Sequence, residues 1–118
     1  MHQSIWLATD VRRFSALNES LQTEVTIVGG GITGVLSAYL LSQNGMRVVL
    51  LERGRLLHGT TGHTTAKVTA QHGLIYHEIL EHFGLENTQK YYQSQVEAIQ
   101  FIKDTADHYQ IPCQFDHQ

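Results

Sequence analysis

Two short apolar runs flank a segment with helical periodicity in the first half of the chain. Residues 24–28 (EVTIV) and 47–51 (RVVLL) are short and rich in β-branched side chains, which is typical of strands buried on both faces. Between them, residues 32–44 carry an apolar stripe at helical spacing and end at Gly45, a favoured helix terminator. The pattern predicts a strand, a helix and a second strand that lies beside the first and parallel to it.

The rest of the chain adds helices and one further strand signal. Residues 1–23 have no sustained period and predict an arm with a short helix. Two amphipathic stretches, residues 74–83 and 86–110, predict two helices interrupted at Gly84. The alternation of apolar positions over residues 111–115 predicts the opening of a strand. Together these elements predict an α/β fold.

Composition narrows the class of protein without identifying it. A formal net charge of −3 gives no basic surplus for nucleic acid, and no apolar run is long enough for a membrane span or a signal peptide. Cys113 is the single cysteine, so no internal disulfide can form and the cytoplasm is the expected compartment. His77 and His82 lie five positions apart, whereas a helical pair sharing a metal lies three or four apart, so no metal site is expected.

The turn after the first predicted strand has the glycine spacing of a dinucleotide fingerprint. Gly29 allows the sharp turn, Gly31 lets a pyrophosphate approach the backbone, and Gly34 lets the helix pack closely on the strand. The unpaired amides of the first helical turn would then face the phosphates. Glu52 follows Gly34 by 52 − 34 = 18 positions, close to the roughly 20 expected of the acid that binds the ribose hydroxyls. The alternative is a glycine-rich turn that only joins a strand to a helix.

The segment after Glu52, residues 53–73, is small, rich in threonine and punctuated by glycine. Threonine hydroxyls and glycine amides can each donate to a phosphate oxygen. We therefore predict a second phosphate-contacting turn in this segment, with a surface linker as the alternative.

Three motifs carry a family resemblance: VGGGITG at residues 28–34, ERG at residues 52–54 and GTTGHTT at residues 59–65. With them the chain resembles the amino-terminal FAD-binding part of the D-amino-acid oxidase (DAO) superfamily, which covers D-amino-acid, glycine and sarcosine oxidases and related dehydrogenases. It is most similar to a subgroup whose longer members carry a carboxyl-terminal Rieske iron–sulfur domain, which these residues do not include. The resemblance implies a Rossmann-like βαβ unit with additional helices, within a domain over residues 24–118 that is truncated before the substrate domain.

The resemblance also implies that the dinucleotide is FAD and assigns residues to it. The glycine turn would hold the pyrophosphate, Glu52 the adenosine ribose, and Arg53 would lie near the adenine. Threonines of the third motif would approach the pyrophosphate and the ribityl chain. The implied cofactor-binding residues are Gly29, Gly30, Gly31, Ile32, Thr33, Gly34, Glu52, Arg53, Thr60, Thr61, Gly62, His63, Thr64 and Thr65.

His63 raises a separate hypothesis about how the flavin is held. In dimethylglycine and sarcosine dehydrogenases of the superfamily, a Gly-Ser-Thr-Trp-His-Ala-Ala-Gly motif carries a histidine bonded covalently to the flavin. His63 falls at the matching position of residues 59–66 (GTTGHTTA), with Gly62 in place of the tryptophan. A covalent bond through His63, a histidine hydrogen-bonded near the flavin and a solvated histidine are all open.

The leading functional hypothesis is the FAD-binding portion of an oxidoreductase that oxidises the C–N bond of a small amine or amino acid. No catalytic residue is assigned, because family members draw most substrate-binding groups from a later sheet, and the chain alone is expected to lack substantial turnover. Two alternatives stay open: a non-catalytic truncated fragment or binding module, and an NAD-dependent dehydrogenase domain. The substrate, the electron acceptor and the oligomeric state do not follow from the residues.

Overall fold

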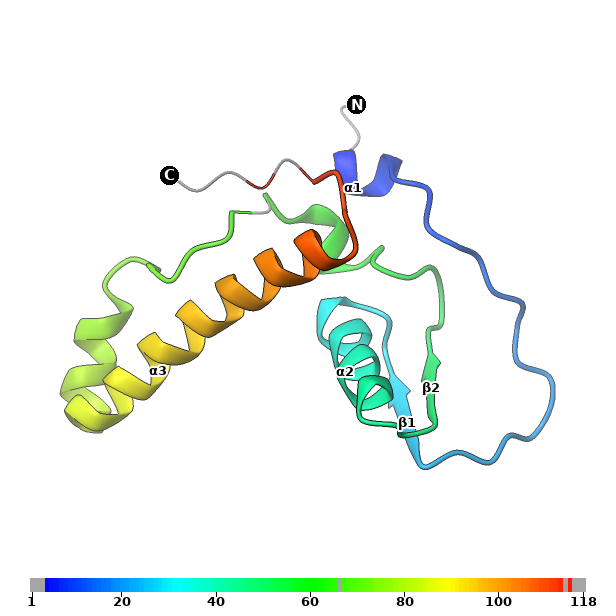
Figure 1. The fold of residues 1–118 in the computed structure, drawn as a ribbon, viewed down its shortest axis with the longest axis horizontal. Helices are drawn as coiled ribbons and strands as arrows, with labels where there is room; N and C mark the ends of the chain where they lie inside the picture. The colour runs from blue at the N-terminus through cyan, green and yellow to red at the C-terminus, as the bar shows by residue number, and fades with distance from the viewer. Residues whose placement is uncertain (1–3, 66, 114, 116–118) are drawn as a thin grey trace. The chain divides into compact units, whose positions relative to one another are not determined.

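A computed structural model describes residues 4–65, 67–113 and 115. The elements, in chain order, are α1 (Ile5–Ala8), β1 (Val25–Val28), α2 (Ile32–Gln43), β2 (Val48–Leu51), a 3₁₀ helix η1 (Thr60–His63) and α3 (Ile75–His108) (Figure 1). They form two compact units, Met1–Thr65 and Ala66–Gln118, which are described separately. Within the described ranges, no helix is both long and apolar enough to cross a bilayer.

The first unit is built on a two-stranded parallel sheet. β1 and β2 pair from Val25 opposite Val48 to Val28 opposite Leu51, and α2 connects them and packs on both (Figure 1). The predicted strand, helix and parallel strand are confirmed, with bounds within one residue of those expected. Because both strands run the same way, their carboxyl ends meet at one edge of the sheet.

The predicted burial of β1 on both faces is wrong. Val25 and Ile27 are half-buried, whereas Thr26 is exposed and Val28 is 85% exposed. The helix explains the difference, since an added Cβ on Gly34 of α2 would lie 3.4 Å from Ile27 Cγ2, which places Ile27 on the face that α2 covers. Alternate residues of a strand point to opposite faces, so Thr26 and Val28 lie on the other side.

Little of the apolar surface is removed from solvent. Among the described residues Ala106 is the one buried apolar residue, at 8% exposure, and no large side chain is fully buried. A chain of this length could bury a larger core. The hydrophobic contribution to the stability of each unit is therefore small, and local contacts in the turns carry more weight.

The arm contains the short helix that the sequence predicts. Trp6 of α1 donates from Nε1 to the Thr64 carbonyl at 2.8 Å. Leu7 of the same helix lies close to η1, since an added Cβ on Gly62 would be 2.6 Å from Leu7 Cδ2. These contacts hold the arm's helix against the segment that follows β2.

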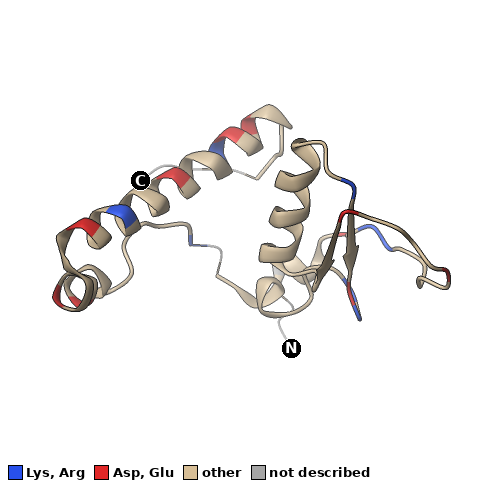
Figure 2. Ribbon diagram, turned by 90° about the horizontal axis from the view of Figure 1, so that it is seen from below, with Lys and Arg blue, Asp and Glu red and all other residues tan. Residues whose placement is uncertain are grey.

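The second unit contains the two helical segments of α3. Gly84 has φ 76° and ψ 174°, a conformation that favours glycine, and it separates them as predicted. The Tyr76 ring lies 5.9 Å from each of the Tyr91 and Tyr92 rings, so aromatic packing joins the two segments. Figure 2 shows acidic and basic residues spread along α3, which is typical of a solvated helix.

The strand predicted over residues 111–115 is absent from the described part of this stretch. Cys113 donates its amide to the Ile111 carbonyl at 2.7 Å, which is a local turn. A strand needs a neighbouring strand for its ladder, and the described part of the second unit offers none. Residue 114 lies outside the described residues.

Candidate functional site

The glycine turn lies at the carboxyl ends of both strands. Gly29 follows β1 with φ +109°, where side chains are strained, and donates its amide to the Leu51 carbonyl at 2.8 Å. An added Cβ on Gly34 would lie 1.9 Å from the Gly29 carbonyl oxygen. Glycine is therefore required at Gly29 by the backbone conformation and at Gly34 by the close approach of the helix to the strand.

Glu52, directly after β2, is tied to this turn by backbone amides. Its Oε2 accepts from the Gly30 amide at 2.7 Å, and its Oε1 accepts from the Gly54 amide at 2.7 Å. The hydrogen bonds from Gly54 and Gly30 lower the pKa of Glu52 below its ordinary value near 4.5, and the charge of Arg53 lowers it further. The ionised carboxylate keeps further acceptor capacity on both oxygens for the hydroxyls of a ligand.

Glu52→Gln tests this pKa through the pH dependence of stability. A lowered pKa in the folded state stabilises the protein above the unfolded value near 4.5, and this contribution is lost as pH falls through the folded pKa. We expect the urea midpoint of the wild type to exceed that of Glu52→Gln at about pH 6, and the gap to narrow at about pH 3. Glu19→Gln removes an exposed carboxylate of the arm and is the control; a gap independent of pH would contradict the assignment.

The threonine-rich segment is brought to the amino terminus of α2. Thr61 of η1 accepts the Ile32 amide with its Oγ1 at 3.0 Å, and the Leu57 amide donates to the Gly30 carbonyl at 2.8 Å. The segment thus lies against the glycine turn. This position agrees with the predicted phosphate-contacting turn and not with a surface linker remote from the site. One detail differs from expectation, because the Ile32 amide predicted to face a phosphate is capped by the Thr61 hydroxyl.

A cavity of about 670 Å³ is formed by these segments. Most of the residues assigned to the cofactor line it, and four do not: Arg53, Gly62, His63 and Thr65. The full lining is Val28, Gly29, Gly30, Gly31, Ile32, Thr33, Gly34, Glu52, Arg55, Leu57, Gly59, Thr60, Thr61 and Thr64. We refer to this space as the glycine-turn cavity.

The four assigned residues outside the lining occupy other positions. Arg53 lines a neighbouring cavity, and Gly62 is buried, with the Leu57 carbonyl only 2.6 Å from where a Cβ would be. His63 lies with Nδ1 2.9 Å from the Gly59 carbonyl oxygen, and Thr65 is exposed. In the part of the chain that the structure describes, no three His, Cys, Asp or Glu side chains converge on a possible metal site.

Sequence reasoning left out several lining residues, of which Arg55 and Leu57 lie between the second and third motifs. Gly59 belongs to a motif that the resemblance used, so it could have been included. Arg55 carried no signal, because an arginine after a strand is more often a solvated side chain than a ligand-binding one.

The donor set of the cavity indicates the kind of ligand that it can accept. Backbone amides, threonine hydroxyls and the amino end of a helix favour an anion such as a phosphate, while the Glu52 carboxylate favours hydroxyl groups. A Cβ on Gly31 would meet only Thr61 Oγ1, at 3.4 Å, so at this residue the backbone is open to a close-lying group. Phosphates beside hydroxyls are the features of a nucleotide.

Comparison with known proteins places the chain among nucleotide-dependent redox proteins. The family model of FAD-dependent oxidoreductases (DAO) matches residues 24–118. The chain belongs to this family, which confirms the membership that the motifs predict.

The relatives include several oxidoreductases. A Bacillus subtilis (strain 168) protein, YhfW, named provisionally as a Rieske 2Fe-2S iron–sulfur protein, is 50% identical over 111 residues, covering 94% of this chain and 22% of that protein. Gamma-glutamylputrescine oxidoreductase of Escherichia coli (strain K12) is 29% identical over 117 residues, covering 97% of this chain and 28% of that enzyme. Mitochondrial dimethylglycine dehydrogenase of Rattus norvegicus is 46% identical over 52 residues, covering 43% of this chain and 6% of that enzyme.

The chain spans 22% of the length of YhfW, 28% of gamma-glutamylputrescine oxidoreductase and 6% of dimethylglycine dehydrogenase. The match to YhfW agrees with the predicted likeness to Rieske-bearing members of the family. No solved structure matches the chain significantly.

Proposed function

We propose that the chain is the FAD-binding part of a flavin-dependent oxidoreductase that oxidises a C–N bond in a small amine or amino acid. The observation that carries the proposal is the meeting of the glycine turn, the threonines of η1 and the Glu52 carboxylate at one edge of the sheet. Membership of a family of FAD-dependent oxidoreductases favours FAD over NAD. The finer assignment of a Rossmann-like domain is part of this proposal.

The residues present fit a dinucleotide. The open backbone at Gly31 and the amino end of α2 would receive the pyrophosphate, and Glu52 would accept hydrogen bonds from the adenosine ribose. Bound FAD supplies the hydride-accepting chemistry. The protein residues orient the dinucleotide by fixing its phosphates and its ribose at the edge of the sheet.

The substrate class rests on the relatives. The names of gamma-glutamylputrescine oxidoreductase and dimethylglycine dehydrogenase both describe nitrogen-containing substrates. We propose a substrate of this general kind for the whole protein. The described residues supply no paired nucleophile and base in the glycine-turn cavity, so the reacting groups are assigned elsewhere in such a protein.

Calorimetric titration of the purified chain with FAD and, separately, with NAD tests the cofactor. We expect saturable binding of FAD and at least about tenfold weaker binding of NAD, since the family membership indicates a flavin. Equal affinities, or a preference for NAD, would overturn the choice of cofactor. Binding of neither would count against the whole proposal.

The same FAD-loaded sample tests the finer hypothesis of a covalent bond through His63. The imidazole lies outside the lining of the cavity, and its Nδ1 faces the Gly59 carbonyl, so Nε2 is the nitrogen left for a bond to the flavin. After acid precipitation, a covalent flavin stays with the protein and fluoresces in a denaturing gel. Flavin that is released into the supernatant would exclude the bond.

A further inference from the structure

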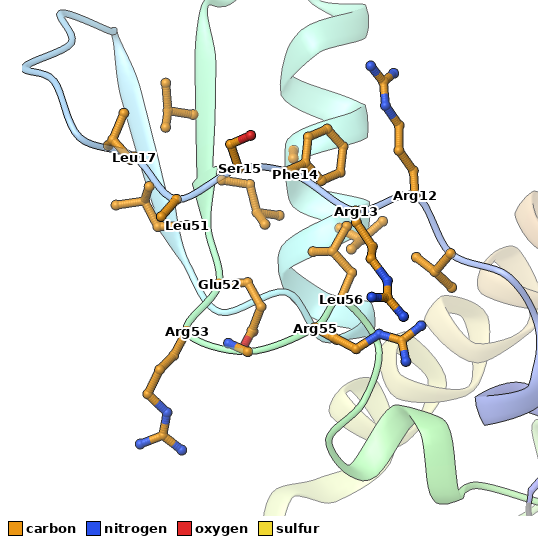
Figure 3. A pocket seen from close by; sticks show the side chains of 17 residues that line it. Arg12, Arg13, Phe14, Ser15, Leu17, Leu51, Glu52, Arg53, Arg55 and Leu56 are labelled. Carbon is orange, nitrogen blue, oxygen red and sulfur yellow. The ribbon is translucent and has the colours of Figure 1, made fainter.

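A second cavity adjoins the glycine-turn cavity on the side of β2. It measures about 780 Å³ and lies between residues 11–17 of the arm, α2, β2 and the segment after β2 (Figure 3). Glu52 is the one acidic residue in its lining. Four arginines also line it: Arg12, Arg13, Arg53 and Arg55. The charge at this side of the first unit is therefore strongly positive, although the whole chain carries a net charge of −3.

Among the described residues, none of these four arginines forms an ion pair, although the charge of Arg53 acts on Glu52. The ion pairs found among the described residues involve other cations, and the Glu52 carboxylate is already hydrogen-bonded by two amides. Arg12 lies over the Phe14 ring, with its guanidinium carbon 5.2 Å from the ring centroid. In Figure 3 the Arg53 side chain points away from the arm, whereas Arg13 and Arg55 extend to the same side. Four guanidinium ions beside a single carboxylate leave an excess of positive charge, which favours an anion.

Arg55 differs from the other three because it lines both cavities. Among the described residues that line the glycine-turn cavity, it is the single Lys or Arg. A bound dinucleotide brings negative phosphates next to Glu52, which is itself negative. The dipole of α2 offsets part of that charge, and its first turn holds no charged side chain. A cation at the border of the cavity would supply the remaining compensation, and Arg55 lies there.

We propose that Arg55 binds a phosphate of the dinucleotide, donating from its guanidinium to a phosphate oxygen. This inference rests on the proposed function and adds to it a residue that neither the fingerprint nor the motifs assign. Arginine suits this role because its planar group can donate two parallel hydrogen bonds to one phosphate. The Arg55 side chain is exposed, and within the described residues its guanidinium has no hydrogen bond or ion pair, so it can turn toward the ligand without breaking either.

Calorimetric titration with ADP and with FAD at low and high salt tests the role of Arg55. Arg55→Gln should weaken both ligands by about tenfold or more, because a charge-assisted hydrogen bond is lost. The salt dependence of affinity should become shallower, since one screened attraction is gone. Arg55→Lys keeps the charge but not the paired donors and should recover part of the affinity.

Arg47→Gln is the matched control. It removes the same charge from the same unit, but Arg47 pairs with Glu24 at the opposite end of the strands and is 73% exposed. Circular dichroism should show folded protein for every variant. Wild-type affinity and an unchanged salt slope in Arg55→Gln would overturn the inference while leaving the proposed function in place. Failure of the wild type to bind either FAD or ADP would instead refute the proposed function, and this inference with it.

Discussion

Replacing Gly34 with alanine is expected to abolish the cooperative unfolding of the first unit. The new Cβ would lie 1.9 Å from the Gly29 carbonyl oxygen, which is backbone in a tight turn and cannot rotate away. Such overpacking costs about 3 kcal/mol or more. Because so little apolar surface is buried in this chain, that loss is comparable with the stability expected of a small unit.

Urea denaturation followed by circular dichroism measures this effect. Gly59→Ala is the control, because Gly59 has φ −76° and an added Cβ would meet nothing within 4 Å. We expect the control to unfold at the wild-type urea concentration and Gly34→Ala to show no folded baseline. A wild-type midpoint for Gly34→Ala would show that the helix does not approach the strand as closely as described.

Replacing Gly31 with alanine is expected to separate cofactor binding from folding. The added Cβ would meet only Thr61 Oγ1, at 3.4 Å, and Gly31 has φ −78° and ψ −175°, which alanine adopts without strain. The fold should therefore persist. The methyl group would stand where we propose that the pyrophosphate approaches the backbone. FAD affinity should therefore fall about ten- to a hundredfold, which corresponds to the loss of one or two charge-assisted hydrogen bonds.

Paired measurements of FAD affinity and of the urea midpoint test this separation. Ser42→Ala lies near the far end of α2, adds no bulk, and is expected to leave both quantities unchanged. If Gly31→Ala keeps the wild-type affinity for FAD, the pyrophosphate does not bind at this turn. Loss of the fold would contradict the open space described at Gly31.

Much of the fold follows from local sequence signals. The β-branched runs, the helical stripe and the interruption at Gly84 are properties of neighbouring residues, and the structure confirms each. The exposed face of β1 and the irregular backbone around Cys113 could not be predicted in this way. Burial and strand formation depend on what packs or pairs with an element, and strand periodicity alone does not reveal the partner.

In the candidate site, too, some features follow from local sequence signals and others depend on how the chain folds. The spacing of the glycines and of Glu52 predicts their meeting, because the carboxyl ends of parallel strands lie at one edge of a sheet. The cap that Thr61 places on the Ile32 amide depends on how residues 53–60 fold back, which no local pattern specifies. Arg55 was missed for the same reason, since its position between two cavities is a property of the folded chain.

Heteronuclear correlation NMR of the nitrogen-15-labelled chain during titration with FAD tests whether the glycine turn of the first unit holds FAD. We predict that the amide resonances of Gly29, Gly31, Ile32 and Thr61 shift in proportion to bound FAD, and that those of the second segment of α3, around Gln100, do not. Saturable binding that leaves the resonances of the glycine turn unmoved, or a titration with no shifts at all, would show that the glycine turn does not hold FAD.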